Sequence, residues 1–307
     1  MKTQIKGVVF LLLTAFIWGV AFVAQSVGIE LIGGFTFSAV RTLIGALVLL
    51  PVILVKDHIT AKKMTADELS ARRRSDKRTL VSGALLGVVF CLASNFQQQA
   101  FYYSSAGKIA FITAIYIFFV PLLGLFFKNK VTLLTWLCVA IGFVGLYFLC
   151  IDGENMTSYN LGDLLALACA FWFAVHILLI ERFTVGSDGL KLSCVQFFVS
   201  GVLSSVLMLV FDSPSISAIL AAAVPILYAG VLSCGVAYTL QIIGQKYTES
   251  SMASLIMCME SVFAVVASAI LLHEVMSVRE TVGCLIMFIA IILPHLVAIV
   301  ANKKRKE

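Results

Sequence analysis

Two ionisable side chains, Arg41 and Glu260, lie within long apolar stretches of the sequence. An arginine at the centre of a bilayer costs about 2.5–3.5 kcal/mol on insertion scales, so it is expected to face water or a carboxylate. Counted at about 1.5 Å per helical residue, the two residues differ in depth by about 6 Å, so Glu260 is the expected partner of Arg41. The pair has two interpretations: a carboxylate that takes up and releases a proton, or a fixed ion pair that holds two helices together.

Nine further polar or aromatic residues in these stretches are candidates for binding an organic solute. Amides and phenols orient amino and carboxyl groups, and indole rings pack against apolar groups or cations. The alternative for each residue is a hydrogen bond between helices or a place in an aromatic belt, and the histidine could also relay protons. The nine residues are Trp18, Asn95, Gln98, Gln99, Tyr116, Trp172, His176, Gln196 and Tyr238; Gln25, Ser233 and Gln241 belong to the same polar group.

The residue pattern does not support other chemistry. His273 and Glu274 are adjacent, but no histidine follows at the spacing of a zinc-binding helix. The eight cysteines lie in or beside apolar stretches without a C-x-x-C pair, which is typical of buried structural thiols. We therefore predict no metal and no cofactor. A membrane-embedded enzyme acting on lipid or peptide is the alternative, and it would have to use Arg41, Glu260 and His176.

Ten apolar stretches of about 19–25 residues position these side chains, each long enough to cross a bilayer. The chain is 61% hydrophobic and only 12% charged, which excludes an ordinary soluble domain. Helices are predicted because a backbone in lipid must satisfy its own hydrogen bonds. Lys and Arg occur in short runs between the stretches, a pattern that does not favour nucleic-acid binding. The predicted spans are 7–27, 33–55, 79–101, 109–127, 131–151, 161–181, 190–211, 219–243, 252–272 and 280–301.

The spans divide into two halves of five, residues 1–151 and 161–301. An odd number of spans per half means that the second half enters the bilayer inverted, a layout associated with alternating access. We therefore predict an all-α polytopic membrane protein built from two inverted five-helix repeats. Residues match across the halves at offsets of 155 or 144, and the matched positions include Gly7 with Gly162, Tyr103 with Tyr247, Arg41 with Gln196 and Tyr116 with Glu260.

Positive charge is biased toward one side of the predicted membrane. With five spans per half, 19 of the 22 Lys and Arg residues fall on one side. The positive-inside rule then places both termini in the cytoplasm, with the chain in an inner or plasma membrane. The longest connection, residues 56–78, is predicted to be a solvated cytoplasmic loop. Contact of its basic residues with anionic lipid headgroups is the alternative.

Several segments carry a family resemblance. The second half contains Met259–Ala264, an apolar helix and then His273–Glu274; the first half contains Phe37–Arg41, Ser105–Thr113 and Val120–Leu122. These segments, within nearly the whole chain, resemble the EamA type of the drug/metabolite transporter superfamily. The first half departs from the pattern, because Asn129–Lys130 stands where the second half has His273–Glu274.

The resemblance implies a secondary-active transporter that exports amino acids or related compounds. Its implied partners are a small-molecule substrate and the lipid bilayer. A non-transporting membrane sensor is a further alternative. The sequence does not define an oligomeric state.

Overall fold

The computed structural model describes residues 2–61, 65–104, 106–126, 131–150, 160–271 and 277–304, and every regular element in them is helical. The first half contains α1 (Lys2–Leu31), α2 (Gly34–Ala61), α3 (Ala66–Ala100), α4 (Ala106–Ala114), α5 (Tyr116–Phe126) and α6 (Leu133–Cys150). The second half contains α7 (Leu161–Phe183), α8 (Gly189–Phe211), α9 (Ile216–Ala221), α10 (Ala223–Leu227), η1 (Tyr228–Ala237), α11 (Tyr238–Gly244), α12 (Ser250–Met257), α13 (Met259–Leu271) and α14 (Val278–Lys304).

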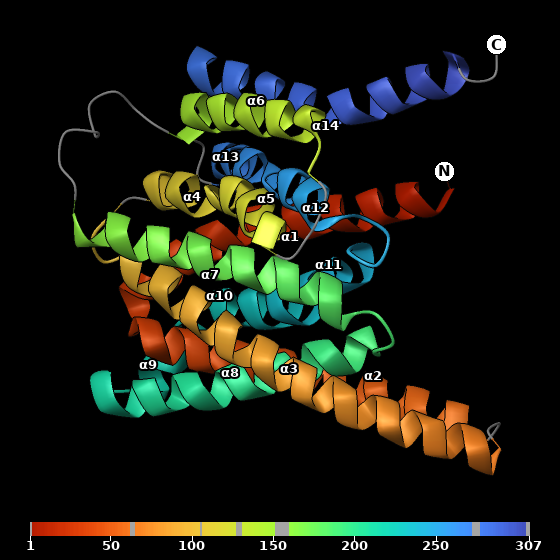
Figure 1. Cartoon of the computed structure of the whole chain (residues 1–307). Coiled ribbons are helices and arrows are strands. Elements are labelled where there is room, and N and C mark those ends of the chain that lie inside the picture. Colours follow the sequence, from red (N-terminus) through yellow and green to blue (C-terminus); the bar gives the residue numbers. More distant parts are fainter. Residues whose placement is uncertain are drawn as a thin grey trace.

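In the described chain these helices form ten apolar segments, because α4–α5, α10–η1–α11 and α12–α13 each follow a single path and the six-residue α9 is a short helix that precedes α10. Eight segments of the described chain are long and apolar enough to cross a membrane. Helix α6 adds a shorter apolar stretch, Leu133–Leu149, and α14 is the tenth segment. The predicted all-helical membrane fold is confirmed. Helix α1 begins and α14 ends on the same side of the molecule, at the right of Figure 1, which we call the terminal side.

The longest connection is largely helical, so its prediction as a loop is wrong. Helix α2 continues to Ala61, and α3 already begins at Ala66. Thr65 caps α3, because its side chain accepts a hydrogen bond from the Glu68 backbone while the Glu68 carboxylate accepts one from the Thr65 backbone at 2.8 Å. This capping box is followed by residues of high helix propensity, which outweigh their polarity.

The helices pack with a pseudo-twofold relation between the halves. Helix α2 packs on its counterpart α8, and α6 packs on its counterpart α14. Helix α3 packs on α7 in the way that η1 and α11 pack on α1. The α6–α14 pair forms one edge of the molecule, and α2, α3 and α8 lie toward the opposite edge (Figure 1). With five segments in each half, this arrangement agrees with inverted repeats.

The matched glycines of the two halves form equivalent helix contacts. A Cβ at Gly7 in α1 would lie 3.0 Å from the Cβ of Tyr247. A Cβ at Gly162 in α7 would lie 2.9 Å from the Cβ of Tyr103. The few identities between the halves therefore include positions where a larger residue would push two segments apart.

Helices α6 and α14 cross at a site that requires glycine. A Cβ at Gly283 would lie 2.7 Å from the Leu149 backbone nitrogen and 2.8 Å from the Gly145 carbonyl oxygen. Because backbone atoms cannot rotate away, we expect Gly283→Ala to lower the free energy of unfolding by about 1–3 kcal/mol. Gly142→Ala is the matched control, since its Cβ meets only side-chain atoms, the nearest at 3.1 Å. Equal melting temperatures of the two variants in detergent would contradict this prediction.

Candidate functional site

A small cavity lies between the two halves. Its volume is about 40 Å³, which is room for a few water molecules. Both halves contribute side chains to its wall, through α1, α2, α3, α4 and α5 on one side and α7, η1, α11 and α13 on the other. The lining residues are Trp18, Ala21, Phe22, Gln25, Arg41, Phe90, Gln97, Thr113, Tyr116, Phe173, Ile177, Ser233, Cys234, Tyr238, Gln241 and Glu260.

Arg41 on α2 supplies a positive charge to the cavity, and only 4% of the residue is exposed. Its Nη1 donates a hydrogen bond to Gln25 Oε1 at 2.7 Å, and its guanidinium lies 5.4 Å from the centre of the Phe37 ring. Its Nε has no partner among the described residues. A guanidinium with an unused donor at a cavity wall can bind an acceptor such as a carboxylate.

Glu260 on α13 interacts with Tyr116 on α5, not with Arg41. The Tyr116 hydroxyl donates to Glu260 Oε1 at 3.2 Å, and both side chains are buried. Among the described residues, the ion pairs do not include Arg41 with Glu260. The predicted partnership is therefore replaced by two separate contacts. Each ionisable group has a neutral hydrogen-bond partner, Gln25 or Tyr116, while both groups line one cavity.

Two helix breaks position Tyr116 and Glu260. Ile115 separates α4 from α5, and Cys258 separates α12 from α13. The breaks touch each other, because the Cys258 Sγ lies 3.9 Å from the Ala114 carbonyl oxygen. Backbone hydrogen bonds continue across both breaks, from Phe118 N–H to the Ile115 carbonyl at 2.9 Å and from Ser261 N–H to the Cys258 carbonyl at 3.1 Å, so each break is a local change of turn geometry and not an unwound segment.

The wide turns of η1 bring further polar groups to the cavity. This segment is a π-helix, a rare geometry that is frequent at functional sites. It places Ser233 and Cys234 in the cavity wall, and Tyr238 follows at the start of α11. Gly230 allows η1 to approach α2, since a Cβ there would lie 3.0 Å from the Arg41 carbonyl oxygen.

Aromatic rings form another part of the wall. The rings of Trp18 and Tyr238 are 4.5 Å apart, those of Phe90 and Tyr238 are 4.9 Å apart, and Phe173 lies 6.3 Å from Phe90. Within the described residues, Trp18 Nε1 and Gln241 Oε1 have no hydrogen-bond partner. The cavity wall therefore combines an apolar surface with three buried polar atoms, Trp18 Nε1, Gln241 Oε1 and Arg41 Nε, that have no partner among the described residues.

The structure brings five of the predicted binding residues together and leaves six outside the cavity lining. His176 Nε2 lies 3.0 Å from Gln196 Oε1, and Asn95 Nδ2 donates to Ser204 Oγ at 2.8 Å. These are hydrogen bonds between helices, the alternative that the sequence left open. The five lining residues are Trp18, Arg41, Tyr116, Tyr238 and Glu260, and the six others are Asn95, Gln98, Gln99, Trp172, His176 and Gln196.

Sequence reasoning missed lining residues that are mostly apolar. Two of the missed residues are Ala21 and Phe22. Together with the predicted Trp18 and Gln25 they are spaced i, i+3, i+4 and i+7, so all four share one face of α1. That spacing was a usable signal. Phe90 carried none, because a phenylalanine in a membrane span is equally compatible with a surface that faces lipid.

Ion pairs join the two halves on the terminal side. Lys191 Nζ lies 2.8 Å from Asp57 Oδ2 and 2.8 Å from Asp76 Oδ1, and Lys56 Nζ lies 2.6 Å from Asp188 Oδ2. We call these five residues the terminal-side cluster. Burial raises the pKa of Asp188, but its hydrogen bonds and the charge of Lys56 outweigh burial and hold that pKa below its ordinary value. Asp188 is therefore charged at neutral pH.

A second set of contacts joins the halves at the other end of the bundle. Lys108 Nζ lies 2.7 Å from Asp163 Oδ2, and Ser104 Oγ donates to Asn160 Oδ1 at 2.9 Å. We call these four residues the opposite-side cluster. The two halves are thus bridged at both ends of the bundle, with the small cavity between the bridges.

Comparison with known proteins gives the family. The model of the EamA-like transporter family matches residues 5–151 and again residues 160–294, so the chain belongs to that family. It is 27% identical to an uncharacterized transporter of Archaeoglobus fulgidus over 93% of this chain and 84% of that protein. It is 22% identical to one of Clostridium kluyveri over 98% of this chain and 96% of that protein. One crystal structure has the same fold, with a TM-score of 0.70 and 15% identity over 93% of this chain and 97% of the other.

The family membership has direct consequences for function. The chain is a multi-pass membrane transporter of the drug/metabolite class, and its family is one of transporters and not of enzymes. The resemblance inferred from the sequence is therefore confirmed.

Proposed function

We propose that the protein is a secondary-active exporter of amino acids or related small solutes that works by alternating access. The observation that carries this proposal is the cavity shared by the two halves, with Arg41 and Glu260 on its wall. The free Nε of Arg41 suits a carboxylate, whereas Gln241 Oε1 and the Glu260 carboxyl suit an ammonium group. The ring of Tyr238 and its aromatic neighbours would pack against the apolar part of the solute.

The size of the cavity supports movement of the halves. A volume of about 40 Å³ is far below the roughly 300–1,000 Å³ of a pocket that holds an organic ligand. A solute can therefore enter only if the halves separate at one end. The terminal-side and opposite-side clusters are the contacts that such movements would break in turn.

We further propose which parts of the protein move and how it is oriented in the membrane. Residues 1–151 and 161–301 would act as the two moving units, with both termini in the cytoplasm because of the charge bias. The terminal side would then be the cytoplasmic side. Because no cofactor is predicted, an ion or solute gradient would supply the driving force.

Counterflow in proteoliposomes tests the proposal. Vesicles containing the purified protein are loaded with an unlabelled amino-acid mixture and then exposed to trace amounts of the same amino acids in labelled form. The expected result is transient, saturable accumulation of label that protein-free vesicles do not show. Binding of amino acids without counterflow would favour a sensor and would overturn the proposal, as would the absence of both.

A further inference from the structure

Glu260 is a buried carboxyl group without a cationic partner in the described ion pairs. It accepts one hydrogen bond, from Tyr116, although an ionised carboxylate offers about four lone-pair sites. The cation in the cavity, Arg41, donates instead to Gln25. An ionised carboxylate inside a membrane protein is costly when no positive charge compensates it. Binding a proton removes that cost.

We propose that Glu260 is the site at which this transporter binds its coupling proton, with Tyr116 as the hydrogen-bond partner that positions the carboxyl group. The coupling role of this proton rests on the proposed function, but proton binding at Glu260 can be tested without any substrate. It names the driving ion, which the family resemblance left open.

The position of the pair in the fold supports this assignment. Tyr116 and Glu260 occupy equivalent positions of the two repeats, and the hydrogen bond joins them directly. Each follows a helix break, and the two breaks are in contact through Cys258 and the Ala114 carbonyl. A contact between equivalent positions lies on the pseudo-twofold axis. A site on that axis stays between the halves when they rock, so it can exchange protons with either side.

Few other titratable groups face Glu260. From the cavity wall these are Arg41 on α2, Tyr238 on α11 and Cys234 on η1. Two buried thiols lie nearby, Cys258 at the helix break two residues before Glu260 and Cys169 on α7. Helix α1 presents Gly19, whose Cβ would lie 2.7 Å from the Glu260 carbonyl oxygen.

Among the described residues, the other helices packed near Glu260 add no cation to the cavity wall. The described ionisable residues of α4, α6 and α14 are Lys108, Cys138, Tyr147, Arg279, Glu280 and Cys284. Lys108 is engaged by Asp163 in the opposite-side cluster, and Glu280 caps the start of α14 through Ser277. Arg41 is therefore the cation whose charge Glu260 offsets in the cavity.

The charge of the cavity gives the coupling its direction. With Glu260 protonated, Arg41 leaves the cavity with one net positive charge, which disfavours an ammonium group. When Glu260 releases its proton to water on one side, the net charge falls to zero and an ammonium group is accepted. Proton and solute would therefore occupy the cavity alternately, and a proton entering the cell would drive a solute out.

Infrared difference spectroscopy on the purified protein tests proton binding directly. Spectra of the wild type between about pH 5 and about pH 9 should contain the C=O band of a protonated carboxylic acid that disappears as pH rises. Glu260→Gln should lose this band. Glu249→Gln, at an exposed glutamate before α12, should keep it. Tyr116→Phe should move the band to higher frequency, because the carboxyl group loses its hydrogen bond.

Several outcomes of the infrared experiment would overturn proton binding at Glu260. A band that persists in Glu260→Gln, or no such band in the wild type, would overturn proton binding at this residue. If Glu260→Gln does not fold, Glu260→Asp should still shift the band. A band at the wild-type frequency in Glu260→Asp would also overturn proton binding at this residue. Loss of the band on adding sodium at constant pH would assign a sodium site instead.

A transport measurement then tests coupling. An inward proton gradient should drive labelled amino acids out of wild-type vesicles. Glu260→Gln fixes the neutral form that disfavours an ammonium group, so it should lose at least about tenfold of this gradient-driven flux, whereas Glu249→Gln should keep it. Gradient-driven flux in Glu260→Gln equal to that of the wild type would overturn the coupling role. If the infrared band behaves as expected but no amino acid is transported, the proposed function fails and proton binding stands.

Discussion

Replacing Arg41 with alanine is expected to remove saturable counterflow of the labelled amino acids. Arg41 is the cation among the described lining residues, and its buried Nε has no hydrogen-bond partner among them. Losing one partner of a buried charged hydrogen bond typically costs about 2–5 kcal/mol, so the loss of flux should be on the order of a hundredfold. Arg41→Lys should restore only part of the flux, because lysine keeps the charge but not the planar set of donors.

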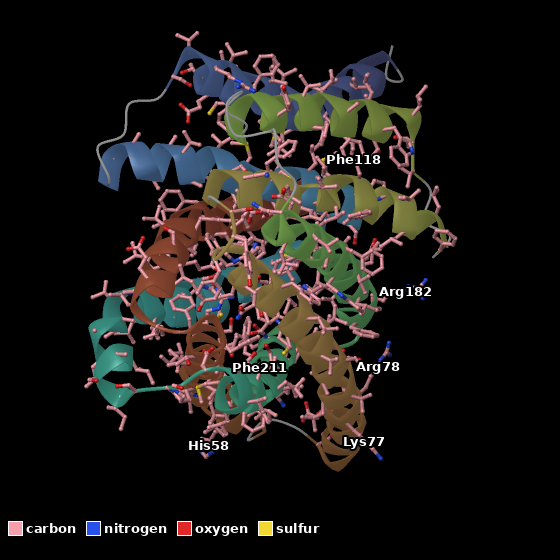
Figure 2. The ribbon with its side chains drawn as sticks, turned by 90° about the vertical axis from the view of Figure 1, so that its left-hand side faces the viewer. His58, Lys77, Arg78, Phe118, Arg182 and Phe211 are labelled. Atoms are coloured by element: carbon pink, nitrogen blue, oxygen red, sulfur yellow. The ribbon has the colours of Figure 1, made fainter. Side chains whose placement is uncertain are left out.

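Arg78→Ala is the matched control for this prediction. Arg78 lies in the first half of α3, and its side chain projects from the edge of the molecule together with that of Arg182 (Figure 2). Its removal also deletes one positive charge but leaves the cavity intact. Equal counterflow in Arg41→Ala and Arg78→Ala would show that Arg41 has a structural role alone.

Reversing the charge of Lys191 is expected to open the terminal side of the transporter. Lys191 holds Asp57 on α2 and Asp76 on α3, and each ion pair is partly exposed to solvent. Such pairs contribute up to about 1 kcal/mol each, and Lys191→Glu also replaces both attractions by repulsions. Two lost pairs shift the equilibrium between closed and open forms by roughly tenfold or more. The labelling rate of Cys234 from the terminal side, in a chain without the other cysteines, measures this shift.

Two further variants make the test specific. Lys108→Glu breaks the ion pair with Asp163 in the opposite-side cluster, so it should raise labelling of Cys234 from the other side. Combining Lys191→Glu with Asp57→Lys and Asp76→Lys restores attraction and should return labelling toward the original rate. If Lys191→Glu and Lys108→Glu change labelling from the same side, the clusters do not act as alternate gates.

Much of the fold followed from hydropathy, because a segment in lipid must be a helix of bilayer length. Hydropathy could not predict the breaks at Ile115 and Cys258, since both residues are compatible with a continuous apolar helix. The breaks arise where two segments meet in the folded chain, which is tertiary information. The helices within 56–78 escape hydropathy for a different reason: the segment is polar, and the signal for its helix is the capping box at Thr65 and Glu68.

The candidate site was only partly predictable, because counting residues along a span gives depth but not direction around the helix. Arg41 and Glu260 were placed at similar depth, and both do line the cavity. Which neighbour each one faces depends on helix rotation, and the partners are Gln25 and Tyr116. The match of Tyr116 with Glu260 between the repeats was visible in the sequence. That equivalent positions meet on the pseudo-twofold axis became evident only from the packing of α5 against α12.

The most direct test of the account is the accessibility of Cys234, which lines the cavity and is only 1% exposed in this structure. A chain with Cys234 as its sole cysteine is placed in sealed vesicles of each orientation and treated with a thiol reagent that cannot cross the membrane. Alternating access predicts labelling in both orientations, slowed from both sides by a transported amino acid. Labelling in one orientation only, or in neither, would contradict a cavity that opens alternately to the two sides of the membrane.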